Sequence, residues 1–511
     1  MTLRAIRPPA EAAAADHFSP HLQWPLLIVI LTVQAVLSLH LIWSNTAYTD
    51  EAGYLWAGHL EIAHFLHGAP VPGFQSWFSG APVIYPPVGA MADSIGGLTA
   101  ARILSLAFMV GATALLWSTT SKLFGLRSAF FAAGLFAVLG PTQFQGALAT
   151  YDALALLMVA GSVWCVVAAQ DHRDSTVLLI AGISLLALAD ATKYATVLFD
   201  PVVIVLAALV IAGKRGRKAA LGRGGYFAAS VIAIIAALLT VGGSKYVTGL
   251  LSTTLARGAG HDSPFLVLAD SFKWAGVAFI LAVAGVIISW RRGTPAQTLV
   301  LATLTAAWLL APLNQARLQT TTSLPKNLDF GAWLAAPAAG YALAELTILI
   351  RRQDLSRATA GLIAVIVLGP AASLGWAQSS NLFRGWPDFS QVITSLRSQT
   401  QEFPGNYLAE DDDVPAYYLQ GGVPWQRWSN TWYFGYRLPS GQQIVSYAAF
   451  SAAISAHYFD LIILDYNSTP KADAAIAGDI TEAGGYRLTV VPTSLGRCDI
   501  WAYEPDRRPG S

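Results

Sequence analysis

The sequence predicts an α-helical polytopic membrane protein, with about eleven spanning helices, followed by a small soluble α/β domain. Hydrophobic residues make up 54% of the 511 residues and charged residues only 12%, and the mean hydropathy is +0.50. Soluble domains carry about 25% charged residues. A soluble protein of this length would lack the polar surface it needs, so lipid must be the solvent for much of the chain. The net charge of +1 gives no indication of nucleic acid as a partner.

The membrane domain is expected at residues 24–377, because a spanning helix needs about 20 mostly apolar residues. Lys and Arg gather in alternate loops, such as 214–223, which places the N-terminus in the cytoplasm. The polar residues 1–23 are expected to be a cytoplasmic segment without a signal peptide. The expected spans are 24–43, 99–118, 128–140, 148–169, 176–190, 194–212, 226–243, 272–290, 296–311, 329–350 and 358–377.

Two long loops are expected on the outer face, at 44–98 and 244–270. Apolar residues at helical spacing in 51–68 predict an amphipathic helix lying in the membrane surface. An odd number of spans puts residues 378–511 outside the cell membrane as well. There the runs 459–464 and 486–491 predict strands, and 468–478 predicts a helix between them. Cys165 and Cys498 fall in different domains, so no disulfide is expected.

Two sets of carboxylates are expected at the outer face. Asp50 and Glu51 directly follow the first span, where a solvated start of the loop is the alternative to a functional role. Asp152 begins the fourth span and is followed by a long apolar run. An ionisable group in that position is costly unless it faces a cavity or a partner, although an Asp that caps a helix at the interface would also fit.

Cations occur near the same face. Lys193 lies in the turn between the fifth and sixth expected spans, where a lysine that extends to the interface is the alternative. Arg317 and Lys326 flank several hydroxyl residues after the ninth span. Such cations suit a phosphate group through charge-assisted hydrogen bonds, and ordinary anchoring at the interface is the alternative. A reaction on this face has no access to cytoplasmic nucleotide sugars, so an activated substrate would most simply arrive as a lipid-linked phosphate.

The order of these motifs resembles that of the GT-C superfamily of glycosyltransferases that use polyprenyl-phosphate sugars. The similarity is greatest to the protein O-mannosyltransferases and the aminoarabinose lipid A transferases, and it extends over roughly 24–350. It depends on Asp50-Glu51, on Tyr85-Pro86-Pro87 in the first outer loop, and on Ala-Arg-Ile-Leu-Ser at 101–105. Thr-Tyr-Asp-Ala-Leu at 150–154 and Ala-Thr-Lys-Tyr at 191–194 complete it.

The resemblance implies a role for each of these residues. Asp50 would be the catalytic base, and Glu51 and Tyr85 would lie in the substrate site. Asp152 would be the second outer carboxylate, which orients the acceptor or the sugar. Lys193 would meet the donor phosphate, with Arg317 and Lys326 placed to contact it.

A single displacement at the anomeric carbon needs one base and inverts the centre, and cations stabilise the departing phosphate. The resemblance implies no required cofactor and no metal ligand. A divalent metal remains conceivable because His59, His64 and His67 share one loop.

Other functions stay open at this point. A ligase that transfers a whole glycan from a lipid pyrophosphate shares this chemistry. A lipid or sugar transporter would instead need polar or broken helices near the bilayer midplane and internal repeats. The expected partners are a polyprenyl-phosphate sugar, a glycan, lipid or protein acceptor, and the bilayer. Within 378–511 the aromatic stretch 425–436 (WQRWSNTWYFGY) either stacks on sugar rings or packs into a core or a domain seam.

Overall fold

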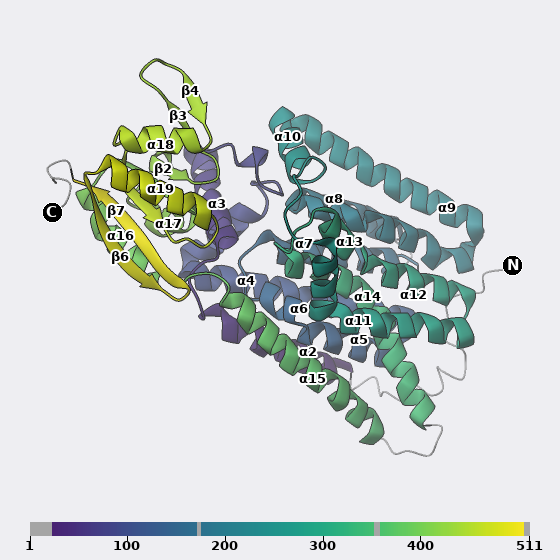
Figure 1. Cartoon of the computed structure of the whole chain (residues 1–511). Helices are drawn as coiled ribbons and strands as arrows, with labels where there is room; N and C mark the ends of the chain where they lie inside the picture. The colour runs from purple at the N-terminus through teal and green to yellow at the C-terminus, as the bar shows by residue number, and fades with distance from the viewer. Residues whose placement is uncertain (1–22, 171–174, 352–357, 505–511) are drawn as a thin grey trace. The chain divides into compact units, whose positions relative to one another are not determined.

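The computed structural model describes residues 23–170, 175–351 and 358–504 (Figure 1). The expected N-terminal segment 1–23 therefore lies almost entirely outside the described residues. The chain divides into two compact units. Unit 1 comprises Met1–Ile42 and Glu61–Leu382, and unit 2 comprises Trp43–Leu60 and Phe383–Ser511. Each unit is described by itself.

Unit 1 is built from helices. Within the described residues, nine helical segments are long and apolar enough to cross a membrane, and they account for nine of the eleven expected spans. The other two expected spans fall on α5, a helix of 13 residues, and on α15. The helices that lie in this unit are α2 (Gln23–Ile42), η2 (Phe74–Ser76), α4 (Tyr85–Phe124), α5 (Leu126–Val138), α6 (Gly140–Gln145), α7 (Tyr151–Ala168), α8 (Ser175–Thr192), η3 (Tyr194–Phe199), α9 (Asp200–Gly242), α10 (Ser244–Thr253), α11 (Pro264–Arg292), α12 (Pro295–Ala307), α13 (Leu310–Arg317), α14 (Leu324–Arg351) and α15 (Ala358–Phe383).

Glycines divide the two longest helical stretches. α4 begins at Tyr85, well before the expected span at 99–118, with Pro86 and Pro87 in its first turn, where their missing N–H groups cost nothing. Its backbone is non-helical at Gly96 and Gly97. α9 is broken at Gly216, which adopts φ +81°, a conformation that favours glycine. This break lies at the start of the second of two candidate spans, Tyr194–Ala212 and Arg215–Gly242.

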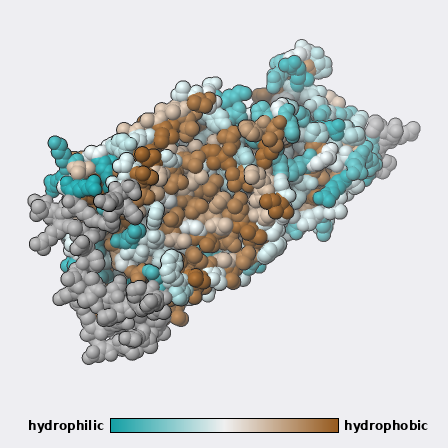
Figure 2. All heavy atoms as spheres, turned by 180° about the vertical axis from the view of Figure 1, so that it is seen from behind, coloured by the Kyte–Doolittle hydropathy of each residue, from teal (hydrophilic) through white to brown (hydrophobic). Residues whose placement is uncertain are grey.

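Small residues let the helices of unit 1 approach closely. A Cβ on Gly285 of α11 would lie 2.2 Å from the carbonyl oxygen of Ala338 on α14, and one on Gly340 would lie 2.3 Å from that of Ser128 on α5. Such contacts are typical of helix packing in membranes, where van der Waals contact replaces the hydrophobic effect. Large apolar side chains such as Ile28, Ile232 and Phe265 remain exposed on the surface, and Figure 2 shows hydrophobic side chains gathered over a broad part of it. The multi-pass membrane fold predicted from the sequence is thus confirmed.

Unit 2 contains the predicted α/β domain. Its five-stranded sheet has the order β2-β1-β5-β7-β6. β1 pairs in parallel with both β2 and β5, whereas β7 is antiparallel to β5 and β6. The strands are β1 (Asn406–Ala409), β2 (Trp428–Asn430), β5 (Phe459–Leu464), β6 (Tyr486–Thr493) and β7 (Gly496–Tyr503), with a separate hairpin of β3 (Gly435–Arg437) and β4 (Gln443–Val445). The helices are α16 (Ser390–Glu402), α17 (Asp413–Leu419), α18 (Tyr447–Ser455) and α19 (Pro470–Ala483).

The predicted elements of this domain are found where the sequence placed them. The expected strand 459–464 is β5, the expected strand at 486–491 forms most of β6, and the expected helix overlaps α19. The inner strand β5 is apolar and nearly all buried, because helices and neighbouring strands cover it. Cys165 and Cys498 are both buried and free.

The start of the first outer loop belongs to unit 2. Asn45 donates from Nδ2 to the carbonyl oxygens of Phe383 (2.8 Å) and Trp386 (3.0 Å). The Trp386 indole donates in return to the carbonyl of Thr46 (3.0 Å), and the N–H of Ala47 donates to the Tyr418 hydroxyl (2.9 Å). The following helix, α3 (Thr49–His67), is the helix predicted at 51–68, and its first part lies in this unit.

Candidate active site

The centre of the candidate site is Asp152, in the first turn of α7. Its side chain is fully buried, and Thr150 donates a hydrogen bond of 2.8 Å to Oδ2. Lys193 forms an ion pair and a hydrogen bond with Oδ1, and the Lys326 ammonium lies 4.0 Å from Oδ2. Both lysines are themselves about 95% buried. The structure thus brings three of the predicted site residues together.

A break between α8 and η3 places Lys193. α8 ends at Thr192, and Lys193 is extended (φ −144°, ψ 107°). The Thr196 hydroxyl donates to the Lys193 carbonyl (2.9 Å), which stabilises the turn. The ammonium donates to Oδ1 of Asn327 at 2.5 Å and lies 5.1 Å from the centroid of the Phe330 ring. A ring face at this distance favours a cation by a further ~1 kcal/mol.

A segment of the first outer loop supports this turn from outside. The N–H of Ala81 donates to the Ala191 carbonyl (2.8 Å), and the N–H of Tyr194 donates to the Ser79 carbonyl (2.9 Å). Between them, a Cβ on Gly80 would lie only 2.0 Å from the carbonyl oxygen of Thr192. Because the blocking atom belongs to the backbone, any side chain at position 80 would push the loop and the Lys193 turn apart.

A second buried carboxyl group, which was not predicted from the sequence, fixes the start of α14. Asp329 is fully buried, and accepts from the Thr142 hydroxyl (2.7 Å) and from Nε2 of Gln145 (3.1 Å). The same Gln145 amide also donates to the Lys326 carbonyl (3.0 Å). Asp329 and α6 therefore hold the turn that carries Lys326. The only signal in the sequence was an acidic residue at the first position of an expected span.

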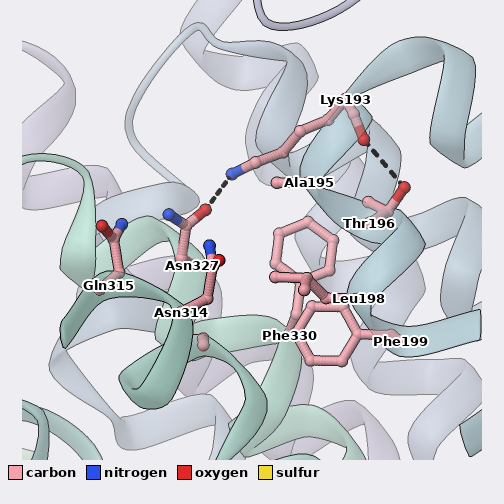
Figure 3. A pocket seen from close by; sticks show the side chains of 10 residues that line it. Lys193, Ala195, Thr196, Leu198, Phe199, Asn314, Gln315, Asn327 and Phe330 are labelled. Atoms are coloured by element: carbon pink, nitrogen blue, oxygen red, sulfur yellow. Dashed lines mark hydrogen bonds between the residues drawn. The ribbon is translucent and has the colours of Figure 1, made fainter. Parts of the chain in front are cut away.

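A small cavity of about 10 Å³ lies beside Lys193, which is room for a single water molecule. Asn327, Gln315 and Phe330 contribute to its walls (Figure 3). Gln315 donates from Nε2 to the Thr322 carbonyl (3.3 Å). A larger group at this position requires the surrounding side chains to move.

Arg317 and Tyr85 are the other predicted site residues of unit 1. Arg317 is exposed at the end of α13 and donates to Oδ1 of Asn314 (3.1 Å). No ion pair joins it to Asp152 among the described residues. Tyr85 is fully buried as the first residue of α4. The roles of both residues stay predictions.

Asp50 and Glu51 lie in the first turn of α3, in unit 2. Glu51 is fully buried, and its Oε2 accepts from the N–H of Tyr48 (2.9 Å), as in a helix-capping box. Two acidic residues of the same unit, Asp411 and Asp413, lie near enough to Asp50 to feel its charge. The Asp413 carboxyl group packs against Gly53, where a Cβ would lie 3.1 Å from its Cγ.

These carboxyl groups shift one another's protonation. Burial raises the pKa of Asp413 well above its usual value, and the charges of Asp412, Asp411 and Asp50 add to the shift. Burial, with a contribution from Asp411, raises the pKa of Asp412 to about 6. The start of α3 therefore packs against a carboxyl group, Asp413, whose protonated form is favoured by burial.

One cluster of carboxylates has the spacing of a metal site. Oxygen atoms of Glu410, Asp465 and Asp473 lie within 4.8 Å of one another. Both oxygens of Glu410 accept backbone N–H groups of the β5–α19 loop: Asp465 and Asn467 donate to Oε2 (both 3.2 Å), and Ser468 and Thr469 to Oε1. Four backbone N–H groups occupy the oxygen lone pairs of Glu410 that a cation would use. This carboxylate therefore lies in a nest of backbone donors. His59, His64 and His67 form no such group among the described residues.

The comparisons with known proteins identify the architecture. The oligosaccharyltransferase of Archaeoglobus fulgidus in its apo form superposes with a TM-score of 0.60 at 15% identity, covering 97% of this chain and 76% of that one. ArnT from Cupriavidus metallidurans bound to undecaprenyl phosphate superposes with a TM-score of 0.58 at 12% identity, covering 93% of this chain and 97% of that one. Both are GT-C glycosyltransferases. The chain has the GT-C fold.

Sequence comparisons agree with this architecture. The model of the dolichyl-phosphate-mannose-protein mannosyltransferase family matches residues 93–241, which carry the Asp152 and Lys193 motifs. No curated protein matches significantly in sequence. A further structure of the Archaeoglobus enzyme, at 14% identity, TM-score 0.60 and the same coverage, contains an inhibitory peptide and a dolichol-phosphate. The expected resemblance to GT-C enzymes that use polyprenyl-phosphate-linked donors is confirmed.

Proposed function

We propose that this protein is a membrane glycosyltransferase that moves one sugar from a polyprenyl-phosphate donor to an acceptor hydroxyl on the extracytoplasmic face. The observation that carries the proposal is the buried group of Asp152, Lys193 and Lys326, with the half-buried Asn327 beside it, in a GT-C fold. Buried charges in a membrane domain are costly and mark functional sites. Here they lie at the ends of α7, α8 and α14, at positions that the sequence assigns to one membrane face.

The lysines suit the leaving group of this reaction. As the bond between the anomeric carbon and the phosphate oxygen breaks, its electron pair stays on the phosphate. Ammonium groups already positioned for that charge lower the barrier without reorganisation. Lys193 is held by Asp152, Asn327 and the turn at Thr192, and Lys326 is held by Gln145 through its carbonyl. We assign both lysines to the donor phosphate, with Arg317 as an outer contact.

The carboxylates suit the acceptor side. In the proposed step the acceptor oxygen bonds to the anomeric carbon and its proton passes to Asp50, the general base, so the centre is inverted. Glu51 holds the first turn of α3 and with it the backbone of Asp50. Asp152 orients Lys193 and the bound sugar, and Tyr85 completes the substrate site. No cofactor takes part in this scheme.

A second candidate is a glycan ligase with a lipid-pyrophosphate donor. It is favoured by the oligosaccharyltransferase among the superposing structures. The same two lysines would then hold a pyrophosphate, and the reaction would transfer a whole glycan.

The test is donor turnover by the full chain. Purified protein is incubated with radiolabelled polyprenyl-phosphate sugars, one at a time, together with a membrane extract that supplies acceptors, and released polyprenyl phosphate is measured. We expect one donor to turn over, and both Asp50→Asn and Asp152→Asn to abolish it. Asp262→Asn is the matched control, because an amide oxygen can still accept the two 2.7 Å hydrogen bonds from Thr321.

The outcomes separate the two candidates. Turnover only of lipid-pyrophosphate glycans would favour the ligase. Failure to bind or turn over either kind of donor would overturn both, provided that the protein remains folded.

A further inference from the structure

A cleft of about 550 Å³ lies in unit 2, between the hairpin β3–β4, the segment before it and the start of α18. Figure 1 shows these elements together in the C-terminal domain. The volume is within the range of about 300–1,000 Å³ that is typical of clefts for small ligands. Trp432, Tyr433 and Tyr447 line it, and they are 54%, 84% and 43% exposed. Three large aromatic side chains open to solvent around one hollow are unusual unless something binds there.

Hydrogen bonds at their edges hold two of these rings. The Trp432 indole donates to Oδ1 of Asp411 (3.1 Å), and the Tyr447 hydroxyl donates to Oδ2 of Asp479 (2.8 Å). Partial burial and the Asp479 carboxylate raise the pKa of Tyr447 to about 12, so it stays a neutral donor. Because the Trp432 indole N–H and the Tyr447 hydroxyl already form hydrogen bonds within the protein, a ligand would contact the faces of these rings. Rings that are fixed in advance also bind at a lower entropic cost.

The backbone next to these rings is fixed too. The N–H groups of Trp432 and Tyr433 both donate to Oδ1 of Asn430, at 3.1 and 2.8 Å. Phe434, the next residue, stacks on Phe450 with ring centroids 5.2 Å apart and packs against the core of the sheet. Phe434 therefore packs against the core while it also borders the cleft, whereas Trp432 and Tyr433 line the cleft and remain exposed.

The chemistry of the lining selects the class of ligand. Besides the rings, Thr431, Gln443 and Ser446 supply neutral polar groups, and none of the described lining residues is Lys, Arg, Asp or Glu. An anionic ligand would find no cation there, and a lipid chain would find neutral polar groups that it cannot pair. A sugar matches both features, since its hydroxyls form hydrogen bonds and its slightly positive C–H groups rest on the negative faces of aromatic rings.

We infer that this cleft binds a neutral saccharide chain. Resting on the proposed function, we further assign that chain as the acceptor, so that the acceptor is a glycan. Saccharide binding by itself does not depend on the transferase reaction, and the two parts are tested separately.

Binding is measured first, on the full chain in a detergent whose head group is not a sugar. Neutral hexasaccharides of mannose, glucose and galactose are titrated by calorimetry without any donor. We expect at least one to bind, and Trp432→Ala and Tyr433→Ala each to weaken it by about tenfold. Leu495→Ala, which removes a 51% exposed apolar side chain of the same unit outside the cleft, is the control and should bind normally.

Tyr447→Phe tests whether the fixed ring matters. It keeps the ring but loses the bond to Asp479, so it should weaken binding by less than either alanine variant. Since Tyr433 is mostly exposed, its variant is expected to fold, and circular dichroism checks this. The inference is overturned by failure of all three hexasaccharides to bind, by binding that ignores Trp432 and Tyr433, or by preferential binding of peptides or lipids.

The acceptor assignment is tested with the donor present. We expect the label to appear on the bound hexasaccharide, with Trp432→Ala raising KM and leaving kcat nearly unchanged. The acceptor role alone would be overturned if the unmodified protein turned over the donor without ever labelling the saccharide, while the saccharide still bound to it and to Asp50→Asn. Binding without any donor turnover would leave the cleft in place and count against the proposed transferase.

Discussion

The two units bury carboxyl groups in opposite ways. In unit 1 the Asp152 carboxylate faces two ammonium groups, from Lys193 and Lys326. In unit 2 Glu410, Asp465 and Asp473 face one another, and backbone N–H groups take the place of cations. Loss of a cation from unit 1 would leave a buried charge without its partner. Unit 2 relieves the same problem because burial and the neighbouring Glu410 raise the pKa values of Asp465 and Asp473, which therefore keep their protons, and this makes the unit sensitive to pH.

The difference teaches that the free-energy cost of burying a charged group helps to distinguish a structural role from a functional one. A carboxyl group that shares a proton or binds a backbone nest can stabilise a soluble domain without any ligand. A carboxylate paired with two lysines inside a membrane domain contributes little net stability, because desolvation offsets the attraction. Retaining it is therefore easier to explain by chemistry than by folding.

The largest effect is expected from breaking the pair in unit 1. Lys193→Met leaves Asp152 buried beside only the more distant Lys326, and should destabilise the protein by about 3–5 kcal/mol and abolish transfer. The double variant Lys193→Met/Asp152→Asn removes both charges, so thermal unfolding should show most of the stability restored while activity stays absent. If the double variant is as unstable as the single one, the ion pair is not the reason for the loss.

Removal of the proposed reacting groups comes next. Asp50→Asn should lower transfer by about 10²–10⁴-fold, the range for a general base, with little change in thermal stability. Donor turnover and thermal unfolding are measured on the same preparation. An Asp50→Asn protein with near-normal activity would assign the base elsewhere, and Asp411 and Asp413 would then be the nearest alternatives.

A steric change at Gly80 tests how the Lys193 turn is held. Gly80→Ala places a Cβ 2.0 Å from the Thr192 carbonyl oxygen, and should cost about 1–3 kcal/mol through overpacking while reducing donor turnover. Gly73→Ala in the same loop is the matched control, since its Cβ would meet only the Ser76 hydroxyl at 3.5 Å. Equal behaviour of the two variants would show that the loop yields without moving Lys193.

The smallest effect is a pH dependence confined to unit 2. Burial, with the hydrogen bond and charge of Glu410, raises the pKa of Asp465 to about 9. A raised pKa means that this contribution to stability is full below about pH 4 and is lost as the pH rises toward 9. Asp465→Asn should therefore stabilise the protein at pH 8 by on the order of 1 kcal/mol, and should have almost no effect at pH 4.

Thermal unfolding of the two proteins across this range checks the sign. A stabilisation that is larger at pH 4 than at pH 8 would contradict the shared protonation of this cluster.

The sequence by itself determined the membrane fold and the α/β domain, and it singled out Asp152, Lys193 and Lys326, which the structure brings together. Apolar runs of spanning length and short strand-like runs indicate whether lipid or water surrounds a segment, and this depends only on the residues of that segment. Asp152 and Lys193 were visible for the same reason, because a charge beside an apolar span is conspicuous. The motif that carries them also placed the chain near the GT-C enzymes, as the superposed structures confirm.

Only the tertiary structure decided which residues meet. It joined Lys326 to Asp152 and Asn327 to Lys193, left Arg317 exposed, and brought Asp329 under the start of α14. It also placed Trp43–Leu60 with the C-terminal domain and gathered Trp432, Tyr433 and Tyr447 around one cleft. Each of these contacts joins segments far apart in the chain, and no local pattern of hydropathy specifies how distant helices and strands pack. The direction of a side chain across such a contact is set by helix crossings and close backbone approaches, such as the one at Gly80, which exist only once the chain has folded.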